Sequence, residues 1–141
     1  MIIRQATLKD APVIQSLLGQ LGYPDFGLEQ VKEKIIAYEK SFYRLLVGEL
    51  NGEVVAFIAL HWFDLLHWSG KAGRITSFCV DEKFRSQGIG QKMIEHSEKL
   101  LFEEGCIKLE VTSNQRRKRA HEFYLNLSYI EDSRRFVKLR K

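Results

Sequence analysis

The chain is a mildly basic one of 141 residues, with 45% hydrophobic residues and a formal net charge of +4. This length suits one domain, so we expect residues 1–141 to form a single domain. No apolar run approaches the ~20 residues of a membrane span. We also expect no secretory signal. These two expectations together predict a cytoplasmic protein without a membrane partner. The charge suits an anionic ligand but is too small to indicate nucleic acid.

The two cysteines, Cys79 and Cys106, both lie in apolar surroundings. This pattern favours buried thiols in a reducing compartment over a disulfide framework. Their spacing is also wrong for a zinc site.

The N-terminal third predicts a short strand followed by two helices. Residues 1–6 form the strand, and Thr7 predicts an N-cap with Asp10 as its capping-box partner. Apolar residues at helical spacing then predict helices over residues 11–21 and 28–38.

A β-hairpin is predicted next, because residues 43–50 and 53–62 flank Asn51-Gly52, a two-residue turn signal. The following loop, residues 63–71, is rich in aromatic side chains. Such a loop is typical of a lid or pocket wall, and a loop folded onto the core remains an equal alternative. His61, Asp64 and His67 lie in this region, but no second cluster of ligands accompanies them, so we expect no metal site.

The rest of the chain alternates strands and helices. The predicted elements are the strand 73–80, the helix 88–104, the strand 107–111, the helix 115–127, and two strands at 129–130 and 135–139. The order β-α-α-β-β-β-α-β-α-β-β predicts a mixed α/β fold that begins with antiparallel strands. The crossover from strand 73–80 to strand 107–111 should be parallel and right-handed.

A glycine-rich turn, Arg85-Ser86-Gln87-Gly88-Ile89-Gly90, joins the strand 73–80 to the helix 88–104. Glycines let the backbone approach a ligand closely and adopt positive φ. The first helical turn has unpaired N–H groups and a positive dipole end, so this turn predicts a phosphate site. Arg85 and Gln87 add side-chain donors beside it.

Three phosphate-binding motifs can be compared with this turn. A Walker loop needs Lys and Ser/Thr where Gln91 and Lys92 stand. A dinucleotide fingerprint needs a small residue at Met93 and should directly follow the strand. The turn instead resembles the R/Q-x-x-G-x-G/A pyrophosphate loop of the GNAT N-acetyltransferase superfamily, which binds acetyl-CoA. The order of elements resembles that family from end to end. The resemblance implies a mixed, mostly antiparallel sheet of about seven strands with about four helices, splayed at the acetyl-CoA cleft.

The resemblance also implies a set of coenzyme-binding residues. In this family the strand before the glycine loop carries a bulge, and its backbone pairs with the pantetheine arm. The matching residues here are Phe78, Cys79 and Val80, and the Val80 N–H would polarise the thioester carbonyl. The pyrophosphate would be held by the loop, at Arg85, Gln87, Gly88, Ile89, Gly90 and Gln91.

The C-terminal part resembles the family's A-x-x-F-Y-x-x-x-G-[FY] segment, beginning at Ala120. Tyr124 matches the tyrosine that protonates the leaving thiolate and contacts the coenzyme. Ser128 stands where the family usually has glycine, so a left-handed turn there would be strained. Asn114 is a coenzyme contact by resemblance, although it lies three residues farther from the tyrosine than in the commonest version.

The basic run Arg116-Arg117-Lys118-Arg119 opens the last predicted helix, where cations oppose the helix dipole unless an anion is bound. The coenzyme's phosphates would supply that anion, and Arg117 is the predicted contact. A solvated face and a nucleic-acid patch are the alternatives.

Many members of the family carry a glutamate as general base on the strand before the glycine loop. Thr76 and Ser77 occupy that region here, which leaves Glu110 or, through water, His67 as substitutes. The sequence therefore predicts a metal-free transferase that moves acetyl from acetyl-CoA to a small primary amine by direct attack. The aromatic segment from Trp62 to Trp68 is the candidate acceptor wall. A non-catalytic coenzyme-A-binding module and a nucleic-acid-binding domain are the alternative functions, and a homodimer is compatible with the sequence.

Overall fold

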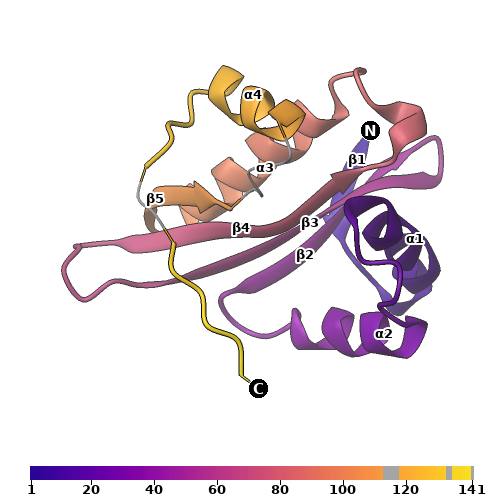
Figure 1. Ribbon diagram of the computed structural model, residues 1–141, viewed down its shortest axis with the longest axis horizontal. Helices are drawn as coiled ribbons and strands as arrows, with labels where there is room; N and C mark the ends of the chain where they lie inside the picture. The colour runs from indigo at the N-terminus through magenta and orange to yellow at the C-terminus, as the bar shows by residue number, and fades with distance from the viewer. Residues whose placement is uncertain (113–117, 133–134, 141) are drawn as a thin grey trace.

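The computed structural model describes residues 1–112, 118–132 and 135–140 (Figure 1). One sheet of five strands, in the order β1-β2-β3-β4-β5, forms its centre. Neighbouring strands are antiparallel from β1 to β4, whereas β4 and β5 are parallel. The strands are β1 (Ile2–Gln5), β2 (Tyr43–Leu50), β3 (Glu53–Asp64), β4 (Lys71–Val80) and β5 (Cys106–Val111).

Helices cover both faces of this sheet (Figure 1). α1 (Ala11–Leu21) and α2 (Leu28–Ala37) lie on one face, and α3 (Ile89–Glu103) and α4 (Lys118–Asn126) lie on the other. Because successive strand residues point to opposite faces, the core is divided into two apolar clusters, one under each helix pair. Short 3-10 turns, η1 (Leu8–Asp10) and η2 (Glu82–Phe84), precede α1 and α3.

An ion pair fixes the start of the α1 layer. Arg4 Nη1 donates to Asp10 Oδ2 at 2.8 Å, and the Thr7 N–H donates to the same carboxylate at 2.8 Å, as the predicted capping box requires. The Arg4 guanidinium and the Thr7 N–H together hold the pKa of Asp10 below its ordinary value against the opposing effect of burial. Asp10 is only 6% exposed, so this charge depends on its partners.

Within the described residues the sheet has five strands rather than the predicted number of about seven, while the mixed α/β class is confirmed. Neither strand nor helix forms in the described parts of the C-terminal segment, residues 129–132 and 135–140. Its apolar side chains at Ile130, Phe136 and Leu139 are more than four-fifths exposed. Alternating apolar residues favour a strand only where an edge is paired and a face is covered, and neither occurs for these described residues.

The predicted boundaries differ at two other places. β3 was predicted to end at Trp62 but continues to Asp64, so Phe63 and Asp64 belong to the strand and not to the following loop. The helix predicted from residue 115 is described from Lys118 onward, and its predicted first turn lies outside the described residues.

Cys79 and Cys106 are both buried thiols, as expected. None of the described helices is long and apolar enough to cross a membrane.

Candidate functional site

The sheet opens between β4 and β5. Their parallel ladder runs from Lys71 opposite Cys106 to Ile75 opposite Val111, where β5 ends. β4 continues for five more residues to Val80, about 16 Å at the usual strand rise. We call the place after Ile75 and Val111, where the two strands part, the splay point. Beyond it, β4 pairs only with β3 among the described residues, so no described strand pairs with its other backbone edge.

A β-bulge lies directly beside the splay point. Ala59 of β3 is opposite Ser77, but Leu60 is opposite Ile75, so Thr76 is the extra residue on β4. The Thr76 hydroxyl donates to the Ala59 carbonyl at 3.3 Å. Bulges bend a strand and re-aim its side chains next to active sites. The bulge that the family resemblance implies is therefore confirmed in this strand.

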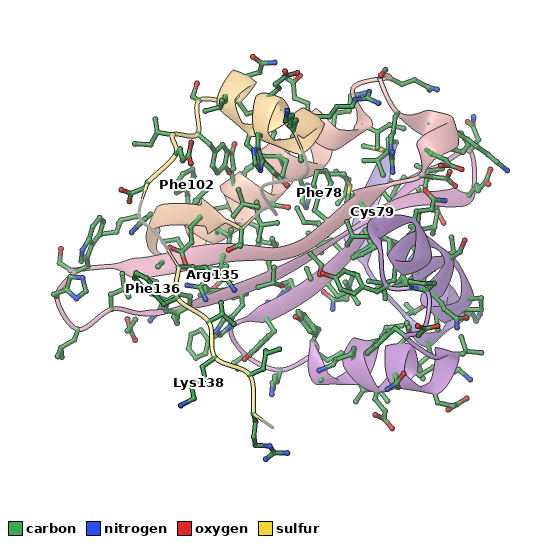
Figure 2. All side chains as sticks on the ribbon, in the orientation of Figure 1. Phe78, Cys79, Phe102, Arg135, Phe136 and Lys138 are labelled. Atoms are coloured by element: carbon green, nitrogen blue, oxygen red, sulfur yellow. The ribbon has the colours of Figure 1, made fainter. Side chains whose placement is uncertain are left out.

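The predicted pantetheine-binding residues lie on the unpaired length of β4. Phe78 points toward α4, where its ring lies 6.0 Å from the ring of Phe123. Cys79 is buried on the opposite side, in the cluster under α1 and α2 (labelled in Figure 2). The Val80 carbonyl accepts a hydrogen bond from Arg85 Nε at 3.0 Å, which folds this side chain of the glycine-rich turn back onto the strand.

The glycine-rich turn has the backbone geometry of an anion site. Ser86 has a φ of 65° and Gly88 a φ of 80°, so the chain makes a left-handed turn before α3 begins at Ile89. Gly88 is the N-cap and supplies no side-chain cap hydrogen bond. The N–H groups of Ile89, Gly90 and Gln91 form the first helical turn, where no intrahelical acceptor is available. Phosphate oxygens suit these donors.

Gly90 is glycine for a second reason that sequence reasoning missed. A Cβ on this residue would lie 3.3 Å from two ring carbons of Phe123 and 3.5 Å from the Phe78 ring. The missing side chain thus lets α4 pack against the beginning of α3. A substitution at Gly90 would test helix packing and phosphate binding together.

Tyr124 lies in a row of aromatic rings on α4 and beyond its end. Its ring centroid is 5.3 Å from that of Phe123 and 5.9 Å from that of Tyr129. Tyr129 donates its hydroxyl hydrogen to Glu98 at 2.9 Å. The pKa of Tyr129 is raised, mainly by burial and secondly by this hydrogen bond. The row packs α4 against α3. It also places Tyr124 on the same face of the sheet as the Phe78 side chain.

The end of α4 forms a Schellman motif. The Tyr129 N–H donates to the Tyr124 carbonyl at 3.0 Å, and the Ser128 N–H donates to the Leu125 carbonyl at 3.1 Å. Ser128 has a φ of 70°, so the left-handed residue predicted at this position is confirmed. Among the described residues, α1 ends in the same motif with glycine, Gly22, in the left-handed position.

The opposite face of the sheet carries an aromatic strip at the splay point, composed of Tyr38, Tyr43, His61 and Phe63. The His61 ring is stacked between the other strand rings, 4.3 Å from Tyr43 and 5.2 Å from Phe63. The Tyr38 ring meets Tyr43 edge-on at 5.3 Å. The Tyr38 hydroxyl lies 3.5 Å from the hydroxyl of Thr76, the bulge residue.

A single line of cross-strand partners extends this strip to β5. Tyr43 is opposite His61, His61 is opposite Arg74, and Arg74 is opposite Glu110. Arg74 Nε donates to Glu110 Oε1 at 2.6 Å, and the guanidinium lies over the Phe63 ring at 5.1 Å. Directly opposed residues share one face of a sheet. Residues from four strands therefore meet beside the splay point, a grouping that no sequence motif signals.

Part of the predicted acceptor wall lies elsewhere. Trp62 is 2% exposed and belongs to the core cluster on the α3 side, so its ring is not available to an acceptor. His67 and Trp68 lie on the β3–β4 turn, at the far left in Figure 1. This turn is far from the splay point, because Ile75 lies four residues along β4 from Lys71, a distance of about 13 Å at the usual strand rise. Asn114 and Arg117, which the resemblance assigned to the coenzyme, lie outside the described residues.

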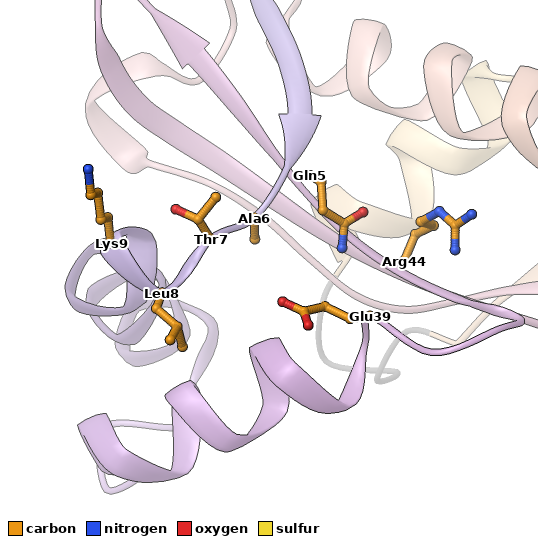
Figure 3. A pocket seen from close by; sticks show the side chains of 7 residues that line it. All are labelled: Gln5, Ala6, Thr7, Leu8, Lys9, Glu39 and Arg44. Atoms are coloured by element: carbon orange, nitrogen blue, oxygen red, sulfur yellow. The ribbon is translucent and has the colours of Figure 1, made fainter.

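Two hollows mark the surface on the α1 and α2 side. The larger, about 690 Å³, lies between the end of β1 and α2, with Lys9, Glu39 and Arg44 in its lining (Figure 3). It borders β1 and β2, at the opposite side of the sheet from β5. The smaller, about 240 Å³, lies under α1 and α2 and includes Tyr38 and Ser77 in its lining. The smaller hollow therefore adjoins the splay point. No group of three His, Cys, Asp or Glu side chains suited to a metal ion occurs in the described part of the chain.

A family model described as "Acetyltransferase (GNAT) family" matches residues 14–129. The chain belongs to this family. The predicted resemblance and the predicted acyltransferase class are thereby confirmed, and the family's acetyl donor is acetyl-CoA.

Curated relatives and solved structures agree with this membership. An aminoalkylphosphonate N-acetyltransferase of Salmonella typhimurium is 30% identical over 139 residues, covering 96% of this chain and 89% of the relative. A thialysine N-epsilon-acetyltransferase of Bos taurus is 29% identical over 136 residues, covering 87% and 80%. An aminoglycoside N-acetyltransferase solved in complex with CoA superimposes with a TM-score of 0.84 at 16% identity, covering 99% of this chain and 93% of that one, which shows the shared fold.

Proposed function

We propose that this chain, acting as a single domain, transfers an acetyl group from acetyl-CoA to the primary amine of a small acceptor by direct attack. The observation that carries the proposal is the parting of β4 from β5, with a glycine-capped helix start at the far end of the unpaired strand. Thioester chemistry at the splay point and phosphate binding at α3 would then be separated by the length of β4 that remains unpaired.

The coenzyme fits this arrangement from its phosphates inward. The pyrophosphate lies at the N–H groups of Gln87 to Gln91, with Arg85 beside it. The pantetheine arm runs along Phe78, Cys79 and Val80, pairing with the backbone edge that β5 leaves open. Asn114 and Arg117 complete the coenzyme contacts in this proposal, with Arg117 at a phosphate.

The chemistry needs an oxyanion donor and a proton donor. The Val80 N–H is oriented by the strand before charge develops on the thioester oxygen. Tyr124 protonates the departing sulfur, because a phenol stays protonated at neutral pH and can donate as the sulfur gains charge. Holding amine and thioester in one cleft supplies proximity.

The acceptor we propose is a small amine that also carries an anionic group. The Salmonella relative is named for aminoalkylphosphonates and the bovine relative for thialysine. The hollow of about 240 Å³ beside the splay point is small and mostly apolar, with Lys34 as the cation in its lining. A phosphonate or carboxylate at Lys34 would direct the amine toward Ser77.

The test combines coenzyme binding with turnover. We expect acetyl-CoA to raise the Tm, since a ligand bound only by the folded state stabilises it. We expect 2-aminoethylphosphonate to release free thiol from acetyl-CoA. The exposed Gln87→Glu change adds a carboxylate at the proposed pyrophosphate site and should remove most of the Tm shift, because like charges repel.

Gln30→Glu is the matched control, because it makes the same chemical change on the first turn of α2. It should leave the Tm shift intact. A full shift in Gln87→Glu would exclude the glycine-rich turn as the phosphate site. Coenzyme binding without thiol release from any small amine would favour the non-catalytic alternative.

A further inference from the structure

The proposed reaction needs a proton acceptor for the amine, and the family's usual glutamate is missing from β4. Arg74, Thr76 and Ser77 occupy the strand around the bulge, and none of them is a base at neutral pH. Two side chains of the face described above can accept a proton, His61 and Glu110. Their surroundings differ, and the difference decides between them.

Glu110 is held by a cation. Arg74 donates to Glu110 Oε1 through Nε, and a second guanidinium nitrogen lies against the same oxygen. That carboxylate oxygen is therefore already engaged as an acceptor by Arg74. Glu110 thus serves to place Arg74, whose guanidinium covers the outer ring of the strip, Phe63.

His61 is held so that one ring nitrogen remains for chemistry. Its Nδ1 lies 3.1 Å from the Phe42 carbonyl oxygen. A carbonyl oxygen can only accept, so Nδ1 must carry the hydrogen. In the neutral imidazole, Nε2 then has the lone pair. The stacked rings of Tyr43 and Phe63 fix the ring plane, so the tautomer and the orientation are both set by the fold.

The position of His61 also suits the reaction. It is two residues from Ala59 on β3, so both side chains share a face, and Ala59 is the partner of Ser77 at the bulge. Ala59 and Ser77 both line the hollow of about 240 Å³, so His61 lies one step along the same strand face from the space proposed for the acceptor. Tyr38 of the strip also lines this hollow.

We propose that His61 is the proton acceptor for the attacking amine; this rests on the proposed acetyl transfer. His61 Nε2 takes a proton from the ammonium form of the acceptor, and the neutral nitrogen attacks the thioester carbon. A carbon–nitrogen bond forms, the carbon–sulfur bond breaks, and the proton lost by the nitrogen is matched by one given to the sulfur. The proton on His61 passes to solvent, so one ammonium and one thioester yield one amide, one thiol and one proton.

Several charged and titratable groups bear on this step. Arg74 of β4 is the direct neighbour of His61, and Glu110 of β5 balances its charge. Tyr43 of β2 has Lys40 over its ring at 4.9 Å, and Tyr38 reaches the strip from the end of α2. The imidazole must be neutral to accept a proton, so turnover should fall as the pH is lowered.

His61→Asn is the test variant, because the shorter amide can still donate to the Phe42 carbonyl but has no basic nitrogen. With acetyl-CoA and 2-aminoethylphosphonate or thialysine, kcat/KM should fall by about 10²-fold or more, the usual contribution of a general base. In the variant the rate should follow the fraction of acceptor that is already neutral, so it should keep rising with pH beyond the point at which the rate of the unmodified protein levels off. The Tm shift with acetyl-CoA should be unchanged, since the coenzyme lies along β4 and α3.

His96→Asn is the matched control, because His96 is exposed on α3. It should leave both the rate and the pH profile unchanged. Equal activity and equal pH profiles in His61→Asn and the unmodified protein would overturn the role of His61 and leave the proposed transfer intact. Inactivity of the unmodified protein toward every amine would overturn the proposed transfer and this role with it.

Discussion

The two sides of the splay point present different chemical groups: backbone groups on one side and side chains on the other. On the proposed coenzyme side, the groups that would face the ligand are mainly backbone donors of β4 and of the turn before α3, shaped by Ser86 and Gly88. On the proposed acceptor side, they are side chains from separate strands that come together through register, such as Tyr43, His61 and Arg74. A site made of backbone groups can be recognised in six consecutive residues. A site made of side chains that meet through strand register has no contiguous sequence motif. This difference explains why family membership was readable from the sequence and the acceptor surface was not.

Apart from the loss expected for His61→Asn, the largest effect should come from Tyr124, a side chain of the proposed coenzyme side. Tyr124→Phe keeps the ring that packs between Phe123 and Tyr129 and removes only the hydroxyl. We expect kcat to fall by about 10²-fold, the low end for general acid catalysis because a thiolate is a good leaving group. The Tm shift with acetyl-CoA should persist. Stopped-flow thiol release measures the first quantity and a melting curve the second. Turnover at the unmodified rate would remove Tyr124 from the mechanism and leave water as the proton source.

A smaller effect, on the free energy of unfolding, is expected at the start of α1. Asp10→Asn removes a carboxylate that accepts from Arg4 and Thr7. Hydrogen bonds to charged groups contribute about 1.5–3 kcal/mol each, so we expect unfolding free energy to fall by about 2 kcal/mol in urea titrations at neutral pH. Because the folded pKa of Asp10 is depressed, its contribution is present above the unfolded pKa of an aspartate and is lost as pH falls through the folded value.

The control for this prediction is Asp25→Asn, an exposed aspartate in the turn between α1 and α2. It should leave stability within about 0.5 kcal/mol. If Asp10→Asn and the unmodified protein lose stability in parallel as the pH is lowered, the Arg4 pair does not stabilise this layer.

The smallest effect concerns the two Schellman motifs, one on each side of the sheet. Ser128→Gly relieves a left-handed residue with a Cβ, and we expect a gain of about 0.5–1 kcal/mol. Gly22→Ser is the reciprocal change at the end of α1 and should cost a similar amount, about 1 kcal/mol. Urea midpoints of the two variants give both values. A loss of stability in Ser128→Gly would mean that the serine side chain contributes more than its backbone strain costs.

The local chemistry of the chain determined a large part of this protein. Asn51-Gly52 placed the hairpin, helical spacing placed α1 to α3, and the strand–turn–helix around Gly88 indicated an anion site. These features depend on residues close together in sequence, so propensity and periodicity are enough to predict them. Even the left-handed Ser128 could be predicted, because the end of a helix is a local structure.

Tertiary structure decided the rest. The C-terminal residues 135–140 alternate like a strand, but a strand needs a partner edge that no local pattern can supply. Trp62 was expected at the acceptor and is buried, because alternation along β3 points its side chain away from the face of His61 and into the core beneath α3. His61 lies beside Arg74, and Arg74 lies beside Glu110, although these residues are 13 and 36 positions apart in the sequence. Such contacts are fixed by the register of a sheet, and register is set by the packing of whole faces and by the bulge at Thr76.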